Sequence, residues 1–171
     1  MSIILDNIRD IPDFPKPGIL FKDITPLLAN PAAFGHVIEL LTAHYKNMKI
    51  SKVIGIESRG FIFGAPLAYS LGVGFVPVRK PGKLPHKTLK ESYELEYGFD
   101  TLEIHAEDIQ PNERVLVIDD LLATGGTAAA VGRLLEKLQA HVVSFAFLIE
   151  LSFLHGRQKL AGHEIFSIVQ Y

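Results

Sequence analysis

The chain has 171 residues, of which 48% are hydrophobic and 21% charged, as expected for one globular domain with a substantial core. Its formal net charge of -2 argues against a broad basic surface for nucleic acid or for an anionic membrane. Cysteine is absent, which excludes disulfides and thiolate metal sites and fits a reducing compartment. We therefore expect a cytoplasmic protein that binds neither nucleic acid nor membranes.

The first third of the sequence predicts a cap followed by a helix. Five prolines fall between residues 11 and 31, which favours an irregular cap over about residues 1–33. We expect no signal peptide, because Asp6 interrupts the first apolar run. A helix should start at Asn30-Pro31, a favoured N-cap followed by proline at the first helical position. Apolar residues then recur at helical spacing, namely Phe34, Val37, Ile38, Leu41, Tyr45 and Met48.

Beyond residue 50, apolar strands alternate with helices. Such alternation indicates an α/β fold with a parallel sheet that is covered on both faces. The uncharged stretch over residues 60–78 holds four glycines and two prolines, so we interpret it as a buried helix, a turn and a strand instead of a membrane span. Strands are predicted at 52–56, 74–78, 114–118, 141–149 and 165–169, and helices at 61–71 and 127–139.

Residues 91–105 do not follow this alternation. Tyr93, Leu95 and Tyr97 alternate with acids, and after a glycine-containing turn Leu102 and Ile104 alternate again. This pattern predicts a half-exposed hairpin or a long excursion. Excursions of this length in compact domains tend to be functional lids.

Charged residues follow most of the predicted strands. In open α/β sheets, ligands bind beyond the carboxyl ends of the strands. Any one polar end could be an ordinary solvated loop, but three of the four ends combine charge with permissive backbone, so together they predict a binding site. The four ends are Glu57-Ser58-Arg59-Gly60, Arg79 to Lys83, Asp119-Asp120 with the glycines that follow, and Glu150-Leu151.

The corner Thr124-Gly125-Gly126-Thr127 has the features of a phosphate site. It offers closely spaced backbone N–H groups and opens a helix, whose N-terminus carries roughly +0.5 of a unit charge. It is not a Walker A loop, because no Gly-Lys-Ser/Thr follows, and it is not a dinucleotide fingerprint. A plain glycine turn that caps a helix is the alternative for this motif alone.

Asp119 and Asp120 immediately precede this corner. Two unit charges about 4 Å apart repel by about 4 kcal/mol at an effective dielectric near 20, so acids beside a bound phosphate need a positive or donor-rich group between them. Ribose hydroxyls would satisfy them, and so would Mg²⁺, directly or through its waters. The pattern therefore predicts a sugar phosphate. A response-regulator domain also has paired acids, but we would expect them after its first strand and without the Thr-Gly-Gly-Thr corner.

The segment "VLVIDDLLATGGTA" resembles the phosphoribosyl-diphosphate signature of the type I phosphoribosyltransferases. Further segments resemble the adenine phosphoribosyltransferase family, and the resemblance runs from about residue 10 to the end. It implies one domain over residues 1–171 with a parallel-sheet type I phosphoribosyltransferase fold, helices on both faces, an N-terminal hood and a flexible lid hairpin. The segments are "FPKPGILFKDITPLL", "IGIESRGFIFGAPLA", "VRKPGKLP", "SYELEYG" and "GRQKLAG".

This resemblance implies an activity. A ribose 5-phosphate unit would pass from phosphoribosyl diphosphate to adenine, giving AMP and diphosphate, with Mg²⁺ as cofactor and a homodimer as the assembly. Two alternatives stay open: a transferase for xanthine, hypoxanthine or guanine, and a regulator that senses phosphoribosyl diphosphate without catalysis. Such regulators usually carry a DNA-binding segment, for which we expect no spare length in 171 residues.

The resemblance also assigns residues to the parts of the activated sugar. The Glu57–Ser58 peptide bond is expected to be cis, and Mg²⁺ to be held mainly by the substrate. The dimer can bring some basic residues from the neighbouring subunit, while a solvated rim is the alternative for Lys80 and Lys83. The 5′-phosphate would meet Ala123, Thr124, Gly125, Gly126 and Thr127; the ribose hydroxyls, and possible water-mediated Mg²⁺, would meet Asp119 and Asp120; and the diphosphate would meet Ser58, Arg59, Arg79, Lys80 and Lys83.

The base would be bound by the cap and by the end of one strand. The resemblance places Phe21 and Leu151 on the two faces of the ring, with backbone near Leu20 and Lys22 at its edge. Stacking contributes about 1–3 kcal/mol per base and is blind to base identity, so selectivity for adenine must come from hydrogen bonds. Phe21 as an ordinary core residue is the alternative.

Catalysis is assigned to Glu96 and Arg59. Glu96 resembles the family's acid–base residue, ionised at neutral pH and able to take the N7 proton of adenine. Arg59 would stabilise the departing diphosphate together with Mg²⁺. Tyr97 would position the lid. On pattern alone, an outward glutamate on an amphipathic hairpin is the favoured interpretation of Glu96.

Overall fold

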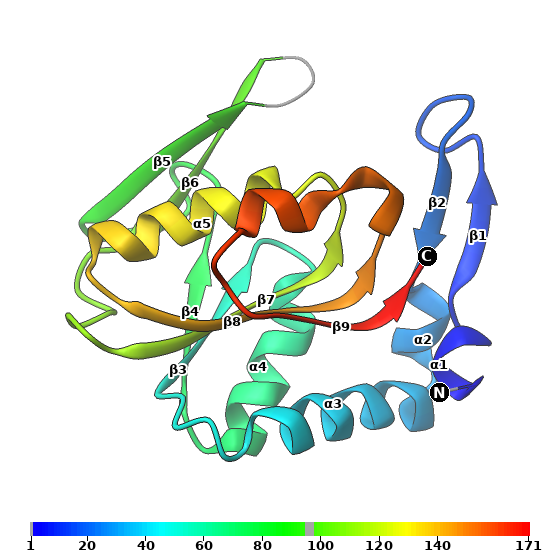
Figure 1. Ribbon diagram of the computed structural model, residues 1–171, viewed down its shortest axis with the longest axis horizontal. Coiled ribbons are helices and arrows are strands. Elements are labelled where there is room, and N and C mark those ends of the chain that lie inside the picture. The colour runs from blue at the N-terminus through cyan, green and yellow to red at the C-terminus, as the bar shows by residue number, and fades with distance from the viewer. Residues whose placement is uncertain (1, 95–97) are drawn as a thin grey trace. The chain divides into compact units, whose positions relative to one another are not determined.

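The computed structural model describes residues 2–94 and 98–171 (Figure 1). The chain divides into two compact units, residues 1–44 and residues 45–171. The expectation of a single domain over residues 1–171, with about residues 1–33 as its cap, stays a prediction.

The first unit is more regular than the irregular cap predicted from its prolines. Its strands β1 and β2 pair antiparallel, and ion pairs of 2.6 Å join Arg9 to Asp23 and Lys22 to Asp10 across the hairpin. Pro12 ends β1, and the next two prolines lie in the connection, where proline removes no ladder hydrogen bond. The elements are α1 (Ser2–Leu5), β1 (Arg9–Pro12), β2 (Leu20–Asp23), α2 (Thr25–Ala29) and α3 (Pro31–Tyr45).

The predicted start of α3 is confirmed. Asn30 Oδ1 accepts hydrogen bonds from the backbone amides of Ala32 at 3.1 Å and Ala33 at 3.2 Å. These amides are among the first N–H groups of the helix, which lack partners within it. Val37 and Leu41, two of the predicted apolar positions on α3, are buried.

The second unit contains a parallel sheet, and its strands agree with the predicted ones. Within the described residues the sheet has five strands in the order β4-β3-β7-β8-β9. Their apolar sequences explain the assignment, because all of β3 after Lys52 is buried, as are Val115 to Ile118 of β7. The strands are β3 (Lys52–Ile56), β4 (Gly74–Val78), β7 (Arg114–Leu122), β8 (His141–Glu150) and β9 (Ile165–Gln170).

The order of the strands explains where the helices lie. The connection from β3 to β4 carries α4 (Gly60–Leu71), and the connection from β7 to β8 carries α5 (Gly126–Lys137). These two crossovers run in opposite directions along the sheet, so right-handed connections put their helices on opposite faces, as Figure 1 shows. Helices on both faces were predicted. Among the described residues, no helix has the length and apolar character that a membrane span requires.

The predicted hairpin is also confirmed. β5 (Thr88–Glu94) and β6 (Phe99–His105) pair antiparallel, with Tyr93 opposite Asp100. The inward-facing residues Tyr93, Leu102 and Ile104 belong to the same buried cluster as Val131 and Leu134 of α5. The hairpin is therefore anchored on α5 through its apolar face, and it extends beyond the sheet in Figure 1.

One strand is longer than predicted. β7 was expected to end at Ile118, but it continues to Leu122 and pairs with β8 as far as Leu122 opposite Glu150. Asp119 and Asp120 therefore lie within the strand and not after it. The reason is the register with β8, whose buried Phe147 and Ile149 continue the apolar core past the two acids.

Candidate active site

The parallel sheet brings the predicted strand ends to one edge. Arg59 follows β3, Arg79 follows β4, Asp120 lies near the end of β7, and Leu151 follows β8. The strand order reverses between β3 and β7, and ligands of open α/β sheets bind at such a switch point. The residues of β3 and β7 do meet there, because Arg59 Nε lies 2.9 Å from Asp120 Oδ2.

Asp119 and Asp120 form a carboxylate pair with few compensating charges. Burial raises the pKa of the Asp119 carboxyl well above its usual range, and the charge of Asp120 adds to this effect. Burial also raises the pKa of Asp120, although the Arg59 guanidinium opposes the shift. Two acids thus share one guanidinium. A cation or a set of hydroxyl donors placed here would stabilise their ionised forms.

Glycine at position 60 allows α4 to approach these acids closely. A Cβ at Gly60 would lie 2.6 Å from the carbonyl oxygen of Ile118 and 3.1 Å from Asp119 Oδ1. Both distances are shorter than ordinary contacts, and the nearer atom is backbone that cannot move aside. Only glycine fits at position 60 without such a clash. The close approach of α4 to β7 in turn allows the Arg59 side chain to reach Asp120.

The predicted phosphate corner begins α5. Gly125 has a φ of 77° and stands at the N-cap position, and Gly126 and Thr127 form the first turn. The same residues line a small cavity together with Asp119 and Phe147. Its volume is about 80 Å³, the share of roughly three liquid waters, so it suits a group of phosphate size at the positive end of the helix.

Gly156, which sequence reasoning did not single out, shapes this corner. A Cβ on Gly125 would lie 2.4 Å from the Gly156 carbonyl oxygen, and a Cβ on Gly156 would lie 2.2 Å from the Ala123 carbonyl oxygen. Gly156 begins the 3-10 helix η2 (Gly156–Leu160). The "GRQKLAG" segment contained the signal, but its contact with the corner spans about thirty residues of sequence, so a local pattern could not reveal it.

The Glu57 side chain, to which the sequence analysis gave no role, contacts the basic groups that follow β4. Arg79 Nε lies 3.3 Å from its carboxylate, the Lys80 amide donates to it at 2.9 Å, and the Lys83 ammonium also contacts it. Burial alone would raise the pKa of Glu57, but these hydrogen bonds outweigh it and lower the pKa to about 2. Arg79 and Lys83 are therefore positioned by a buried carboxylate, which a merely solvated rim would not require. The Glu57–Ser58 bond is cis, as the resemblance implied.

The available oxygen ligands limit how a metal ion could bind. Across residues 2–94 and 98–171, no group of three or more histidine, aspartate or glutamate side chains is arranged around a metal position. Mg²⁺ prefers six oxygen ligands and retains several waters. Asp119 and Asp120 could supply one or two carboxylate oxygens. The site therefore fits a Mg²⁺ ion that takes most of its ligands from a bound phosphate compound and from water.

The residues predicted for the base belong to different units. Leu20, Phe21 and Lys22 form most of β2 in the first unit, where the Phe21 ring packs edge-on against Phe14 with centroids 5.1 Å apart. Leu151 belongs to the second unit and directly follows β8. Their joint role in binding a base stays a prediction. Glu96 and Tyr97 lie outside the described residues.

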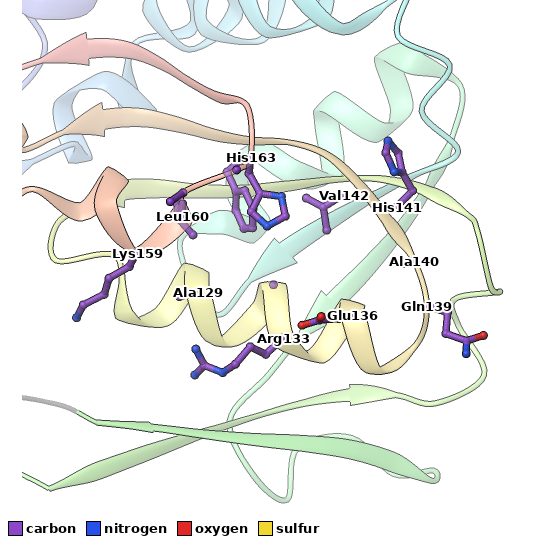
Figure 2. A pocket seen from close by; sticks show the side chains of 14 residues that line it. Ala129, Arg133, Glu136, Gln139, Ala140, His141, Val142, Lys159, Leu160 and His163 are labelled. Atoms are coloured by element: carbon purple, nitrogen blue, oxygen red, sulfur yellow. The ribbon is translucent and has the colours of Figure 1, made fainter.

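A larger cavity elsewhere is not the predicted site. It measures about 540 Å³ and lies between the outer side of α5 and the segment over residues 159–163, with Arg133, Lys159 and His163 around it (Figure 2). Its lining residues differ from those that sequence reasoning assigned to the substrate. The smaller cavity beside Asp119 is lined by the residues of the predicted phosphate corner. We therefore choose it as the candidate site because of its residues, although it is smaller.

Comparison with known proteins agrees with this geometry. The sequence model of the phosphoribosyl transferase domain matches residues 23–164. The chain belongs to the phosphoribosyltransferase family. The type I phosphoribosyltransferase fold predicted from the motifs is confirmed, since solved phosphoribosyltransferases superpose on almost the whole chain.

Within the phosphoribosyltransferase family, the chain is similar to proteins named adenine phosphoribosyltransferase. It is 62% identical to that of Acaryochloris marina, over 96% of each chain, and 58% identical to that of Roseiflexus sp., over 98% of each. The crystal structure of the Thermoanaerobacter pseudethanolicus protein is 55% identical with a TM-score of 0.96, over 99% of both chains. That from Saccharomyces cerevisiae, complexed with an imino-altritol bisphosphate and adenine, is 43% identical with a TM-score of 0.94, over 98% of this chain and 97% of that one.

Proposed function

We propose that this phosphoribosyltransferase transfers ribose 5-phosphate from 5-phosphoribosyl 1-diphosphate to adenine, giving AMP and diphosphate in purine salvage. The observation that carries the proposal is the shared cavity of Asp119 and the corner from Ala123 to Thr127. Its lining combines a carboxylate, which suits sugar hydroxyls, with a helix N-terminus, which suits phosphate, and this combination supports the proposal. Relatives named adenine phosphoribosyltransferase match over nearly the whole chain, which supports adenine as the base.

The described residues divide the binding of the activated sugar among themselves. Backbone N–H groups of the corner and the Thr127 hydroxyl would hold the 5′-phosphate, and Asp119 and Asp120 would accept hydrogen bonds from the ribose hydroxyls. Arg59, beside Asp120, would direct further guanidinium donors toward the diphosphate. Each contact fixes one part of the sugar relative to the base that attacks it.

The diphosphate end has its cations already in place. Glu57 holds Arg79 and Lys83, and Lys80 Nζ lies 3.2 Å from Asp100. Positive groups held before the reaction stabilise the charge that develops on the leaving diphosphate without reorganising. We propose Mg²⁺ as the cofactor; when bound through the substrate and Asp119 or Asp120, it supplies further positive charge to the same leaving group.

We propose Glu96 as the general base that takes the N7 proton of adenine. Replacing Glu96→Gln keeps the size of the side chain and removes its basicity, so kcat should fall by about 100-fold or more while KM for both substrates changes little. Glu94→Gln is the matched control, because Glu94 is exposed on the same hairpin and should keep full turnover. Unchanged kcat in Glu96→Gln would reject the role.

A single assay separates this function from its alternatives. The protein is incubated with phosphoribosyl diphosphate, Mg²⁺ and each purine base in turn, and nucleotide formation is followed. AMP formation from adenine supports the proposal. Turnover with hypoxanthine, guanine or xanthine instead would identify a transferase for another purine, and binding without turnover would identify a sensor.

We further propose a cytoplasmic homodimer. The family resemblance supports it, and so does the exposure of apolar side chains on α4, where Tyr69 is 89% exposed. Sedimentation equilibrium should give about twice the chain mass of 18.9 kDa. A mass that stays at one chain throughout the micromolar range would contradict the dimer.

A further inference from the structure

A row of four hydrogen-bonded side chains crosses the β5–β6 hairpin near its turn. Tyr93 stands directly opposite Asp100, and its hydroxyl donates to Asp100 Oδ2 at 3.3 Å. The same hydroxyl accepts a hydrogen bond from Thr127 Oγ1 at 3.3 Å. Asp100 in turn pairs with Lys80 Nζ at 3.2 Å. The row therefore runs from Thr127 through Tyr93 and Asp100 to Lys80.

The two ends of this row are proposed ligands of opposite ends of one substrate. Thr127 lies in the first turn of α5, at the corner for the 5′-phosphate. Lys80 follows β4, where the basic residues for the diphosphate gather. Three separate elements supply these residues, and only the hairpin joins them. Tyr93 is the central member of the row, yet it has no assigned part in the reaction.

The tyrosine ring and the tyrosine hydroxyl have different surroundings. The ring is 8% exposed and packs in the apolar cluster with Leu102 and Val131, a position that phenylalanine would fill equally well. The hydroxyl reaches past this cluster to two polar partners, as a buried hydroxyl must. Burial raises the pKa of the Tyr93 phenol, so the hydroxyl keeps its proton and can donate at neutral pH.

We propose that Tyr93 is a positioning residue for phosphoribosyl diphosphate, acting through Thr127 at one end and through Asp100 and Lys80 at the other. The inference rests on the proposed function, because it takes Thr127 and Lys80 as substrate ligands. Before the sugar binds, the Tyr93 oxygen accepts from Thr127 Oγ1 and so orients that hydroxyl at the corner; a bound phosphate then accepts the Thr127 proton in its place. A diphosphate draws Lys80 away from Asp100, which then accepts more strongly from Tyr93. The hairpin thereby holds one proposed ligand of each phosphate end in position before the substrate binds.

The test compares Tyr93→Phe with the wild type. KM for phosphoribosyl diphosphate should rise by about three- to tenfold, because the hydroxyl and its two hydrogen bonds are lost, while KM for adenine stays within about twofold. Calorimetric titration with phosphoribosyl diphosphate and Mg²⁺ should show the same loss without any need for turnover. The melting temperature of Tyr93→Phe should stay close to that of the wild type, because the ring and its packing are retained. A loss of affinity would then come from lost positioning and not from unfolding.

Ser92→Ala is the matched control. The Ser92 hydroxyl also forms a cross-strand bond in this hairpin, to Thr101 at 2.9 Å, but on its exposed side. Its removal should leave both KM values unchanged. Asp100→Asn provides a second variant that keeps an acceptor for Tyr93 and removes the charge that holds Lys80. If the row acts as a unit, the double variant Tyr93→Phe, Asp100→Asn should bind the activated sugar no more weakly than the poorer single variant.

The outcomes separate this inference from the proposed function. If the wild type forms no AMP but binds phosphoribosyl diphosphate, the function is wrong, and the titrations still decide the role of Tyr93. Equal affinity of Tyr93→Phe and wild type, or effects that multiply in the double variant, would overturn the positioning role. A wild type that neither turns over nor binds phosphoribosyl diphosphate would overturn both.

Discussion

Asp119 and Glu57 show opposite electrostatic situations at the same edge of the sheet. Asp119 is half-buried and adjacent to Asp120, and burial together with that neighbouring charge raises the pKa of its carboxyl well above the ordinary value. Burial acts on Glu57 in the same sense, but donors from Lys83, Lys80 and Arg79 lower its pKa to about 2. Glu57 therefore stabilises the fold above the unfolded pKa of 4.5, and this contribution is lost as the pH falls toward 2. Asp119 has the opposite effect. Its pKa is raised in the folded state, so its ionisation destabilises the fold as the pH rises.

The first prediction is that Asp119→Asn stabilises the protein without substrate while it impairs catalysis. The folded pKa of Asp119 lies above the unfolded value of 3.8, so stability falls as the pH rises from there through the folded pKa. Asparagine stays neutral, and its Oδ1 can still accept from the Asp120 amide, as Asp119 does at 2.9 Å. At pH 7 we expect a rise in Tm of about 2–4 °C, the shift from ~1 kcal/mol in a chain of this size.

Differential scanning calorimetry against pH checks this prediction. The advantage of Asp119→Asn should vanish below about pH 4, where the wild-type carboxyl is protonated in both the folded and unfolded states. Asp6→Asn removes an exposed carboxylate and should leave Tm unchanged. An Asp119→Asn protein that melts below the wild type at pH 7 would show that the acid pair stabilises the fold.

At the scale of elements, the phosphate corner depends on backbone packed against backbone. The corner before α5 and the start of η2 approach each other through Gly125 and Gly156, with no side chain between them. The residues of the corner line the small cavity beside Asp119. Rigid backbone placement is what a phosphate site needs, because its donors must be oriented before the ligand arrives.

The second prediction is that Gly156→Ala disrupts this corner. The new Cβ would meet the Ala123 carbonyl oxygen at 2.2 Å, and both segments must shift to relieve the clash. We expect KM for phosphoribosyl diphosphate to rise by about tenfold or more and Tm to fall, since overpacking typically costs about 1–3 kcal/mol. Gly35→Ala on α3 is the control, because its Cβ meets nothing within 4 Å and should leave KM unchanged. An unaltered KM in Gly156→Ala would argue against a rigid corner.

At the scale of the whole second unit, the sheet order assembles the site. β3 and β7 are neighbours in the sheet although more than fifty residues separate them, and their crossovers leave in opposite directions. The acids of β7 and Arg59 after β3 meet because of that reversal. At this edge the acids Asp119 and Asp120 lie on β7, and the basic residues Arg79 and Lys83 follow β4. This division suits a sugar that carries a phosphate group at each end.

The third prediction concerns stabilisation by the activated sugar. With Mg²⁺, phosphoribosyl diphosphate at about 100 times its Kd should stabilise the protein by roughly 2.7 kcal/mol, which corresponds to a rise in Tm of about 5–10 °C. EDTA should remove most of this shift. Ribose 5-phosphate, which lacks the diphosphate, should give a smaller shift that EDTA leaves unchanged. A full shift in the presence of EDTA would contradict the role of Mg²⁺.

Much of this protein followed from local sequence patterns. The strands of the parallel sheet, the helices α4 and α5, the Asn30 N-cap, the β5–β6 hairpin and the glycine corner were predicted, because periodicity, caps and turn residues act over a few neighbouring positions. The sequence also predicted that Asp119 and Thr124–Thr127 contribute to one site, and these residues, which are close along the chain, do line one small cavity.

The tertiary structure alone decided which distant residues meet. Glu57 as the holder of Arg79 and Lys83, Gly156 beneath the corner, the extension of β7 past its acids and the Thr127–Tyr93–Asp100–Lys80 row all depend on contacts between elements. The role of a buried charge, and the need for glycine at a close contact, depend on the atoms that pack against that position. Those atoms come from elsewhere in the chain, so only the assembled sheet and its crossovers determine them.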